Sequence, residues 1–156
     1  RTLKGERKHT LLWVLDQTST AMGSRELARW ITAPYRDTDI PKRRLTNIRE
    51  LIESGLTASI TNHLKRIGDL ERIVARIGLK SARPRDLTRL RDSLKELPEL
   101  KARLTQSTYQ SVSALGDALL LMETIHQLLD EALEIEPSVV ISAGGVIRER
   151  YDDELD

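Results

Sequence analysis

The chain has 156 residues, the usual size of one domain, and a chain of this length buries about two thirds of its unfolded surface. Its 25 basic residues balance 24 acidic residues, and the formal net charge is +1. This balance excludes a general attraction of the whole domain to nucleic acid or to an anionic membrane, so any contact with phosphate must be local.

Several residue types are rare or missing, and each absence narrows the class of protein. The chain has no cysteine, so it has no disulfide, as expected in a reducing compartment. Aromatic residues make up 3% and phenylalanine is absent, which favours a leucine-rich core between packed helices. No apolar segment approaches the roughly 20 residues of a membrane span, and the first residues lack an apolar signal segment. We therefore expect a cytoplasmic protein without membrane contact.

The N-terminal part begins with an apolar segment and continues with a helix. Residues Leu11–Leu15 form a run that is too short for a stable helix by itself, which predicts a short buried strand. Thr20 is placed to cap a helix that carries Gly23 and Trp30 and ends before Pro34. Two further helices follow, and glycine is expected to end them at residues 55 and 68.

The most informative stretch of the chain is a joint between two amphipathic helices. Apolar residues at positions 70, 73, 74 and 77 follow the helical spacing, and Asp69 is placed to cap that helix. Pro84 then opens a second helix with leucines at positions 87, 90, 94 and 97, because proline is tolerated in the first helical turn. The pattern predicts a tight turn between the two helices.

The remaining segments predict a broken helix, a long helix and a strand pair. Pro98 is expected to end the helix that Pro84 begins. Residues 111–133 carry two apolar stripes, which predicts one long helix buried on two sides. Residues 139–141 and 146–147 predict a short strand pair around a glycine turn. The expected fold class is mainly α, a multi-helix bundle with a short strand near the N-terminus and this strand pair near the C-terminus.

Three segments, in the same order and over nearly the whole chain, resemble the core domain of the bacterial MutS family of DNA mismatch repair proteins. The first is residues 12–25, with Trp30 and Pro34 downstream. The second joins residues 68–72 to residues 82–87. The third is residues 144–147 with residues 151–155. Each segment alone is a weak signature, but together they are specific.

The resemblance implies a helical core, or lever, domain between a connector domain and a DNA clamp. Residues 1–156 would be a single domain, the first part of that core, and would end just before the clamp. In the family the parent protein is a homodimer that encircles mismatched double-stranded DNA and carries its ATPase, with ATP and Mg²⁺, in a separate domain. The second half of the core would return after the clamp, so we expect an exposed apolar stripe on residues 111–133.

The chain lacks the motifs that carry the parent's two active functions. It has no G-x-x-x-x-G-K-[ST] loop for triphosphate and no phenylalanine for a mispair wedge. We therefore expect no catalysis, no cofactor and no metal here, and a structural and allosteric connection between clamp and ATPase. The residues expected to give this connection its rigidity are Gly23, Trp30, Asp69, Arg72, Arg83, Pro84 and Leu87.

Two alternatives stay open. The histidines at positions 9, 63 and 126 lack the spacing of metal ligands, so a metal-dependent enzyme ranks last, and His126 is expected to be a core histidine with one hydrogen bond. Basic clusters at residues 80–85 and at Lys42, Arg43 and Arg44 are candidates for weak phosphate contacts. Such clusters more often face solvent or form ion pairs between helices. The alternative function is a free-standing helical module that binds DNA or a protein through a basic face.

Overall fold

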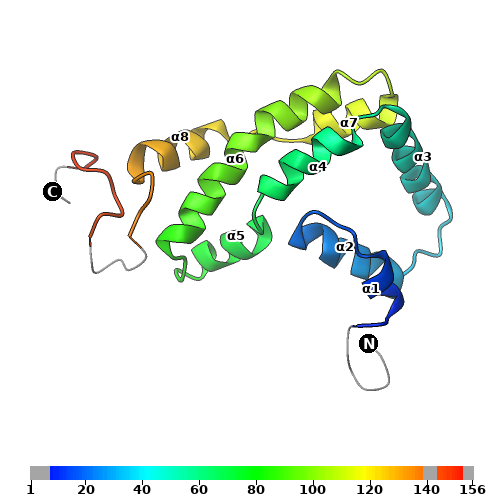
Figure 1. Ribbon diagram of the computed structural model, residues 1–156, viewed down its shortest axis with the longest axis horizontal. Helices are drawn as coiled ribbons and strands as arrows, with labels where there is room; N and C mark the ends of the chain where they lie inside the picture. Colours follow the sequence, from blue (N-terminus) through cyan, green and yellow to red (C-terminus); the bar gives the residue numbers. More distant parts are fainter. Residues whose placement is uncertain (1–7, 139–143, 153–156) are drawn as a thin grey trace.

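The structure is a computed structural model that describes residues 8–138 and 144–152. In this part of the chain the backbone is helical and contains no strand (Figure 1). The helices are α1 (Leu11–Leu15), α2 (Ala21–Thr32), α3 (Asp39–Glu53), α4 (Thr57–Arg66), α5 (Leu70–Gly78), α6 (Pro84–Thr105), α7 (Gln110–Ala118) and α8 (Glu123–Ala132). The mainly helical fold class is confirmed.

Helix α6 is the axis of the domain. It contacts α4, α5, α7 and α8, which lie around it (Figure 1). The core is built on its leucine face, which contributes the buried side chains of Leu90, Leu94, Leu97, Leu100 and Leu104. Ile60, Ile73 and Val112 bring the neighbouring helices onto this face. The core therefore follows one helix, and the other helices are arranged around it.

The predicted strand at residues 11–15 is wrong, because these residues form the short helix α1. Thr10 caps the helix, and its Oγ1 accepts a hydrogen bond from the backbone N–H of Trp13 at 3.2 Å. The prediction also placed this segment in the core, whereas Leu11, Trp13 and Val14 are exposed. A side-chain cap satisfies an orphan amide locally and so supports even one turn of helix.

The predicted starts of α2, α5 and α6 and the predicted end of α3 are confirmed, and each is set by a residue at the boundary itself. Thr20 caps α2 by accepting a hydrogen bond from the Gly23 amide at 2.9 Å. Gly55 follows α3 with a φ of +69°, a left-handed conformation that suits glycine. Asp69 caps α5, and Pro84 occupies the first turn of α6.

The predicted break at Pro98 is wrong, since α6 continues through this residue to Thr105. A proline inside a helix removes one backbone hydrogen bond and costs about 3 kcal/mol or more. Leu94, Leu97 and Leu100 are buried before and after it, and each buried leucine contributes roughly 1.5–3 kcal/mol. Burial on both sides of Pro98 therefore outweighs the local cost.

The predicted long helix over residues 111–133 is divided into α7 and α8. The backbone turns extended at Leu119, and the Nζ of Lys101 on α6 donates a hydrogen bond to the carbonyl of Leu119 at 2.7 Å. The two helices lie along different stretches of α6 (Figure 1). A single straight helix could follow α6 along only one line. The break lets α7 and α8 each pack against α6 in its own direction.

The predicted strand pair near the C-terminus is not formed in the described residues. Leu133 and Ile147 form an isolated antiparallel bridge instead. The first predicted strand, residues 139–141, lies outside the described residues. The pairing therefore begins at the end of α8, several residues earlier than the sequence indicates.

Many large apolar side chains remain exposed. On α3 these are Leu45, Ile48 and Ile52, and within residues 111–133 they include Leu115, Leu120, Met122, Ile125 and Leu128. The expected exposed stripe is thus present, although it lies on two helices and their connection. Patches of this kind mark surfaces that bind other chains.

We expect the isolated chain to self-associate, because association removes these side chains from water. Sedimentation velocity over a range of protein concentrations would measure the effect as a rise in the average sedimentation coefficient. Replacing Leu45, Ile48 and Ile52 with glutamine should reduce it. A coefficient independent of concentration for the unmodified chain would contradict this expectation.

Gly116 allows α7 to approach α6 closely. A Cβ at this position would lie 2.7 Å from the backbone nitrogen of Thr105 and 2.9 Å from the Cβ of Leu104, whereas a Cβ on Gly78 would meet nothing within 4 Å. We therefore expect Gly116→Ala to lower the free energy of unfolding by about 1–3 kcal/mol. Gly78→Ala, the matched control, should leave it unchanged or raise it by up to about 1 kcal/mol. Urea unfolding followed by circular dichroism would measure both, and equal stability of the two variants would refute the close approach.

Candidate functional site

Helices α2 and α5 meet at a charged contact centred on Arg25. Its Nη1 and Nη2 donate hydrogen bonds to the two carboxylate oxygens of Asp69, at 2.8 and 2.6 Å. Its Nε donates to Oε2 of Glu71 at 2.9 Å. A two-pronged arginine contact fixes orientation as well as distance, so Arg25 sets how α2 lies against the start of α5.

Asp69 links this contact to the start of α5. Its Oδ1 also accepts a hydrogen bond from the backbone N–H of Arg72, at 3.4 Å. The hydrogen bonds from Arg25 hold the pKa of the Asp69 carboxyl below its usual value, and Asp69 and Glu71 raise the pKa of Arg25. The contact therefore stays charged at a lower pH than an isolated aspartate would.

Helices α5 and α6 are joined by a second pair, Arg76 and Asp86. Nε and Nη2 of Arg76 donate to the two carboxylate oxygens of Asp86 at 2.8 and 2.7 Å. Asp86 also accepts a hydrogen bond from the backbone N–H of Arg83 at 3.0 Å. Burial raises the pKa of Asp86, but the hydrogen bonds from Arg76 and the Arg83 amide outweigh it, and the pKa is lowered. Asp86 thus connects α5 to the first turn of α6.

Helix α6 holds α4 and the turn after it through uncharged and charged contacts. The backbone N–H of Gly68 donates to Oγ of the fully buried Ser93 at 2.8 Å, and Ser93 donates to the carbonyl of Arg89 at 2.6 Å. One turn further along α6, Oε2 of Glu96 lies 2.8 Å from Nδ1 of the buried His63. These contacts hold α4 parallel to the leucine face.

Helices α2 and α3 are connected by Arg44, one of the residues predicted to contact phosphate. Its guanidinium carbon lies 3.8 Å from the ring centroid of Trp30 and 5.1 Å from that of Tyr35. Glu26 accepts a hydrogen bond from Nε1 of Trp30 at 2.5 Å. Arg44 therefore has a structural contact through a cation–π interaction, and Trp30 lies at the contact between α2 and α3. A role of Trp30 in rigidity stays a prediction.

The two neighbouring basic residues lie on the exposed side of α3. Nζ of Lys42 is 3.5 Å from Oδ1 of Asp39 in the first turn of the same helix. Arg43 borders an open surface pocket between α3 and α7. A phosphate contact by Lys42, Arg43 or Arg44 stays a prediction.

The structure brings some of the predicted coupling residues together. Asp69 and Arg72 meet at the start of α5. Arg83, Pro84 and Leu87 occupy the first turn of α6, where Pro84 is buried and the side chain of Arg83 is exposed. Gly23 lies apart from them near the start of α2, and its Cβ position would face Thr18 and Thr20.

Sequence reasoning missed the partners that make these joints. Arg25 and Asp86 lie in the segments that carry the family resemblance and Arg76 lies between two of them, but nothing in the sequence pairs Arg25 with a carboxylate 44 residues away. Ser93 interrupts the leucine stripe of α6 and is fully buried. A serine inside an apolar stripe is a signal that could have been found, since a buried hydroxyl needs a hydrogen-bond partner.

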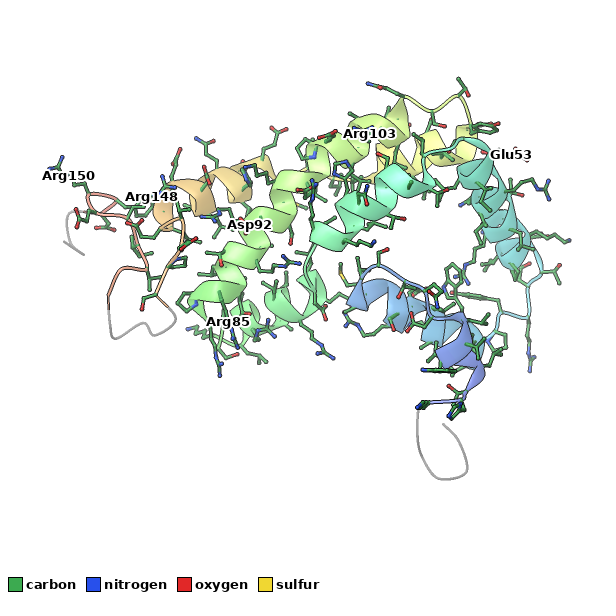
Figure 2. The ribbon with its side chains drawn as sticks, viewed as in Figure 1. Glu53, Arg85, Asp92, Arg103, Arg148 and Arg150 are labelled. Atoms are coloured by element: carbon green, nitrogen blue, oxygen red, sulfur yellow. The ribbon has the colours of Figure 1, made fainter. Side chains whose placement is uncertain are left out.

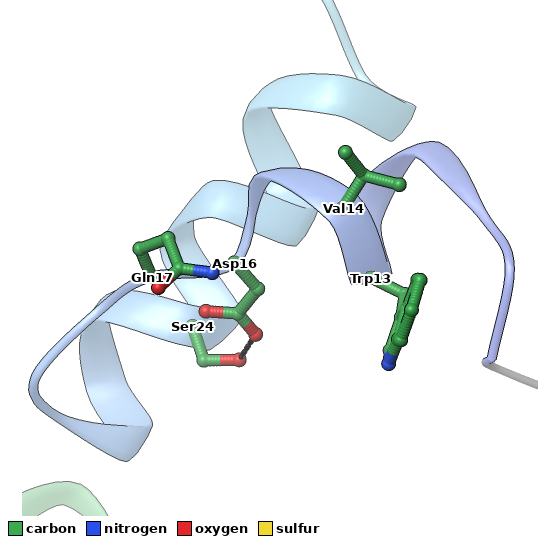
Figure 3. Close-up of a pocket in the computed structure, with 5 residues that line it drawn as sticks. All are labelled: Trp13, Val14, Asp16, Gln17 and Ser24. Atoms are coloured by element: carbon green, nitrogen blue, oxygen red, sulfur yellow. Dashed lines mark hydrogen bonds between the residues drawn. The ribbon is translucent and has the colours of Figure 1, made fainter.

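Two more of the pockets among the described residues lie away from these joints. One, of about 530 Å³, is lined by Trp13, Val14, Asp16, Gln17 and Ser24, and Oγ of Ser24 donates a hydrogen bond to Oδ2 of Asp16 at 2.5 Å (Figure 3). The other, of about 410 Å³, lies between α6 and α8 and is mostly apolar. It includes His126, whose buried Nε2 has no hydrogen-bond partner among the described residues.

Two kinds of site are absent from the described part of the chain. Three or more histidine, aspartate or glutamate side chains do not gather there in a way that could hold a metal ion. None of the described helices combines the length and the apolar character needed to cross a membrane.

These observations define a class of protein: an all-helical scaffold domain whose helices are joined at buried leucines and at arginine–carboxylate pairs. A family model described as MutS domain III matches residues 1–156. The chain therefore belongs to the MutS domain III family, and it is the core, or lever, domain of a mismatch repair protein.

The lowered pKa values of Asp69 and Asp86 predict how stability depends on pH. Because both carboxyls have a lower pKa in the folded chain than the ordinary value of 3.8, their contribution is complete above that value and is lost as the pH falls below it. We expect the free energy of unfolding to fall between about pH 5 and pH 2, and to fall less steeply in the double variant D69N/D86N.

Urea unfolding at each pH, monitored by circular dichroism, would measure the free energy of unfolding. D117N, which changes an exposed carboxylate on α7 away from these joints, is the control and should follow the unmodified chain. Equal pH dependence of the double variant and the unmodified chain would contradict the assignment of the two joints.

Proposed function

We propose that this chain is a non-catalytic lever that couples the DNA clamp and the ATPase of a full-length MutS protein. The observation that carries the proposal is the series of joints from α2 through α5 to α6, in which Arg25 binds Asp69 and Arg76 binds Asp86. Each joint is an oriented ion pair placed where one helix begins. The proposal rests on the family match for its setting and on these joints for its mechanism.

The length and packing of α6 support a lever. With 22 residues, and a rise of about 1.5 Å for each residue, the helix is about 33 Å long. Its leucine face is buried along most of that length, so bending would separate packed side chains. A packed helix of this kind moves as a rigid body and carries a displacement from one end to the other.

The charged joints support coupling rather than simple rigidity. Apolar contacts tolerate sliding, whereas a guanidinium group that binds both oxygens of a carboxylate holds one relative orientation. A movement at the start of α5 would therefore be passed to α2 through Arg25 and to α6 through Asp86. Energetic coupling between distant sites is carried by chains of contacts of this kind.

The partners proposed for the chain follow from this role. They are the other domains of the parent protein, the second subunit of a homodimer, and mismatched double-stranded DNA that the parent holds. ATP and Mg²⁺ would bind a separate ATPase domain, and the chain itself would take no cofactor and catalyse no reaction. The proposed location is the cytoplasm.

The alternative is a module that binds DNA directly through a basic face. The exposed side chains of Lys80, Arg83 and Arg85 at the turn between α5 and α6 are the observation in its favour (Figure 2 labels Arg85). Direct binding by the isolated chain would weaken steeply as salt rises, because each neutralised phosphate releases counterions. Binding with such a salt dependence in a fluorescence anisotropy assay would favour the alternative, and its absence at low salt would exclude the DNA-binding form.

The lever predicts a separation between chemistry and coupling in the full-length protein. We expect Arg25→Ala to reduce the mismatch-dependent acceleration of nucleotide exchange by about tenfold, within the usual range of allosteric coupling. ATP hydrolysis without DNA should stay within about twofold of the unmodified protein, because the variant removes a joint and no catalytic group. Stopped-flow release of a fluorescent nucleotide, with and without mismatched DNA, would measure both.

Arg29→Ala is the matched control. Arg29 lies one turn further along α2, is exposed, and bonds within its own helix to Glu26. Arg29→Ala should leave the mismatch-dependent acceleration of nucleotide exchange unchanged. The lever would be wrong if Arg25→Ala retained full mismatch-dependent exchange.

A further inference from the structure

A buried arginine on α6 binds the segment that follows α8. Arg91 is 8% exposed. Its Nη1 donates a hydrogen bond to the carbonyl oxygen of Glu134 at 3.2 Å, and its Nη2 donates to that of Ile135 at 3.4 Å. One guanidinium group thus holds two consecutive peptide carbonyls just after the helix ends.

That segment is itself half of a short antiparallel contact. Beside the bridge between Leu133 and Ile147, the N–H of Glu134 donates to the carbonyl of Val146 at 3.1 Å. Arg148 donates two more hydrogen bonds across this contact. Its backbone N–H donates to the carbonyl oxygen of Ala132 at 2.9 Å, and its Nε donates to that of Leu133 at 2.8 Å. Residues 132–135 and 146–148 are therefore bonded into one unit, and Arg91 attaches this unit to α6.

The surroundings of Arg91 argue that its role is positional. Carboxylates are nearby, with Oδ1 of Asp92 at 3.1 Å and Oδ1 of Asp130 at 4.0 Å from Nε. Both are more than half exposed, so they balance the charge only in part. Burying a charge is costly, and an apolar residue of similar volume is often at least as stable. A leucine would suit the core here, whereas an arginine can hold two carbonyls in a fixed place.

We propose that Arg91 is a third coupling joint, a positioning residue that carries movement of α6 to the paired segments 132–135 and 146–148. The proposal rests on the lever function proposed above and names the contact through which the far side of the lever is connected. Leu133, 1% exposed, anchors the unit in the core beside this contact. Figure 2 shows Asp92, the neighbour of Arg91, on α6, and Arg148 beside the end of α8.

Hydrogen exchange on the present chain tests the attachment. In Arg91→Leu, which keeps the apolar volume and removes the donors, we expect the amides of Glu134 and Arg148 to exchange about tenfold faster or more. The amide of Ile73 in α5 should keep its rate. Arg91→Lys keeps the charge but loses the two-pronged geometry, and should give an intermediate increase.

Arg103→Leu is the matched control on the same helix, because Arg103 is partly exposed and binds Glu99 one turn away. It should change none of these rates. A general loss of stability would accelerate Ile73 together with Glu134 and Arg148, and that result would overturn the proposal. Unchanged exchange at Glu134 and Arg148 in Arg91→Leu would overturn it as well.

Nucleotide exchange by the full-length protein then tests the coupling. We expect Arg91→Leu to reduce the mismatch-dependent acceleration by about fivefold or more, with Arg103→Leu unchanged. Full acceleration in Arg91→Leu together with a loss in Arg25→Ala would overturn the Arg91 joint and leave the lever in place. Full acceleration in both variants would overturn the lever, and the Arg91 joint with it.

Discussion

The leucine face of α6 is the constraint on which the rest of the domain depends. Leu90, Leu94, Leu97, Leu100 and Leu104 are all buried, and α4, α5, α7 and α8 take their positions by covering them. The same burial lets α6 pass through Pro98 without a break. It also explains why the chain turns at residues 119–122, since a straight continuation of α7 would leave part of this face uncovered.

Charged side chains add what the leucine face cannot supply, which is a fixed orientation for each neighbour. Arg25 orients α2, Arg76 orients α5, and Arg44 joins α3 to α2 through the ring of Trp30. Each arginine acts where a helix starts or where two helices cross. The domain thus combines a continuous apolar axis with separate polar joints, and the proposed lever function depends on this combination.

The parts of this structure that the sequence predicts are those set within a few residues. Asp69 caps an amide of its own helix turn, and Pro84 stands in a first turn where its missing N–H costs nothing, so both roles could be inferred directly. The continuity of α6 through Pro98 depends on burial against distant helices, which short-range patterns do not record. The helix at residues 11–15 was missed although its cap, Thr10, is local, because the apolar run was interpreted as a buried strand. The candidate site was predicted in part for the same reason. Asp69 was identified, but its partner Arg25 is brought to it by the packing of α2, and Arg91 meets carbonyls 43 and 44 residues further along.

Burial is distributed unevenly between helices α1–α3 and the helices around α6, so we expect the two groups of helices to unfold differently on heating. Helices α1, α2 and α3 contain no fully buried residue, and the heat capacity change of unfolding arises chiefly from exposing apolar surface. Detachment of these helices would therefore contribute little to that heat-capacity change. Both tryptophans, Trp13 and Trp30, lie in this region, so their fluorescence reports on the N-terminal helices while ellipticity follows mainly the helices around α6. Any difference between the two melting curves measures how independently the two regions unfold.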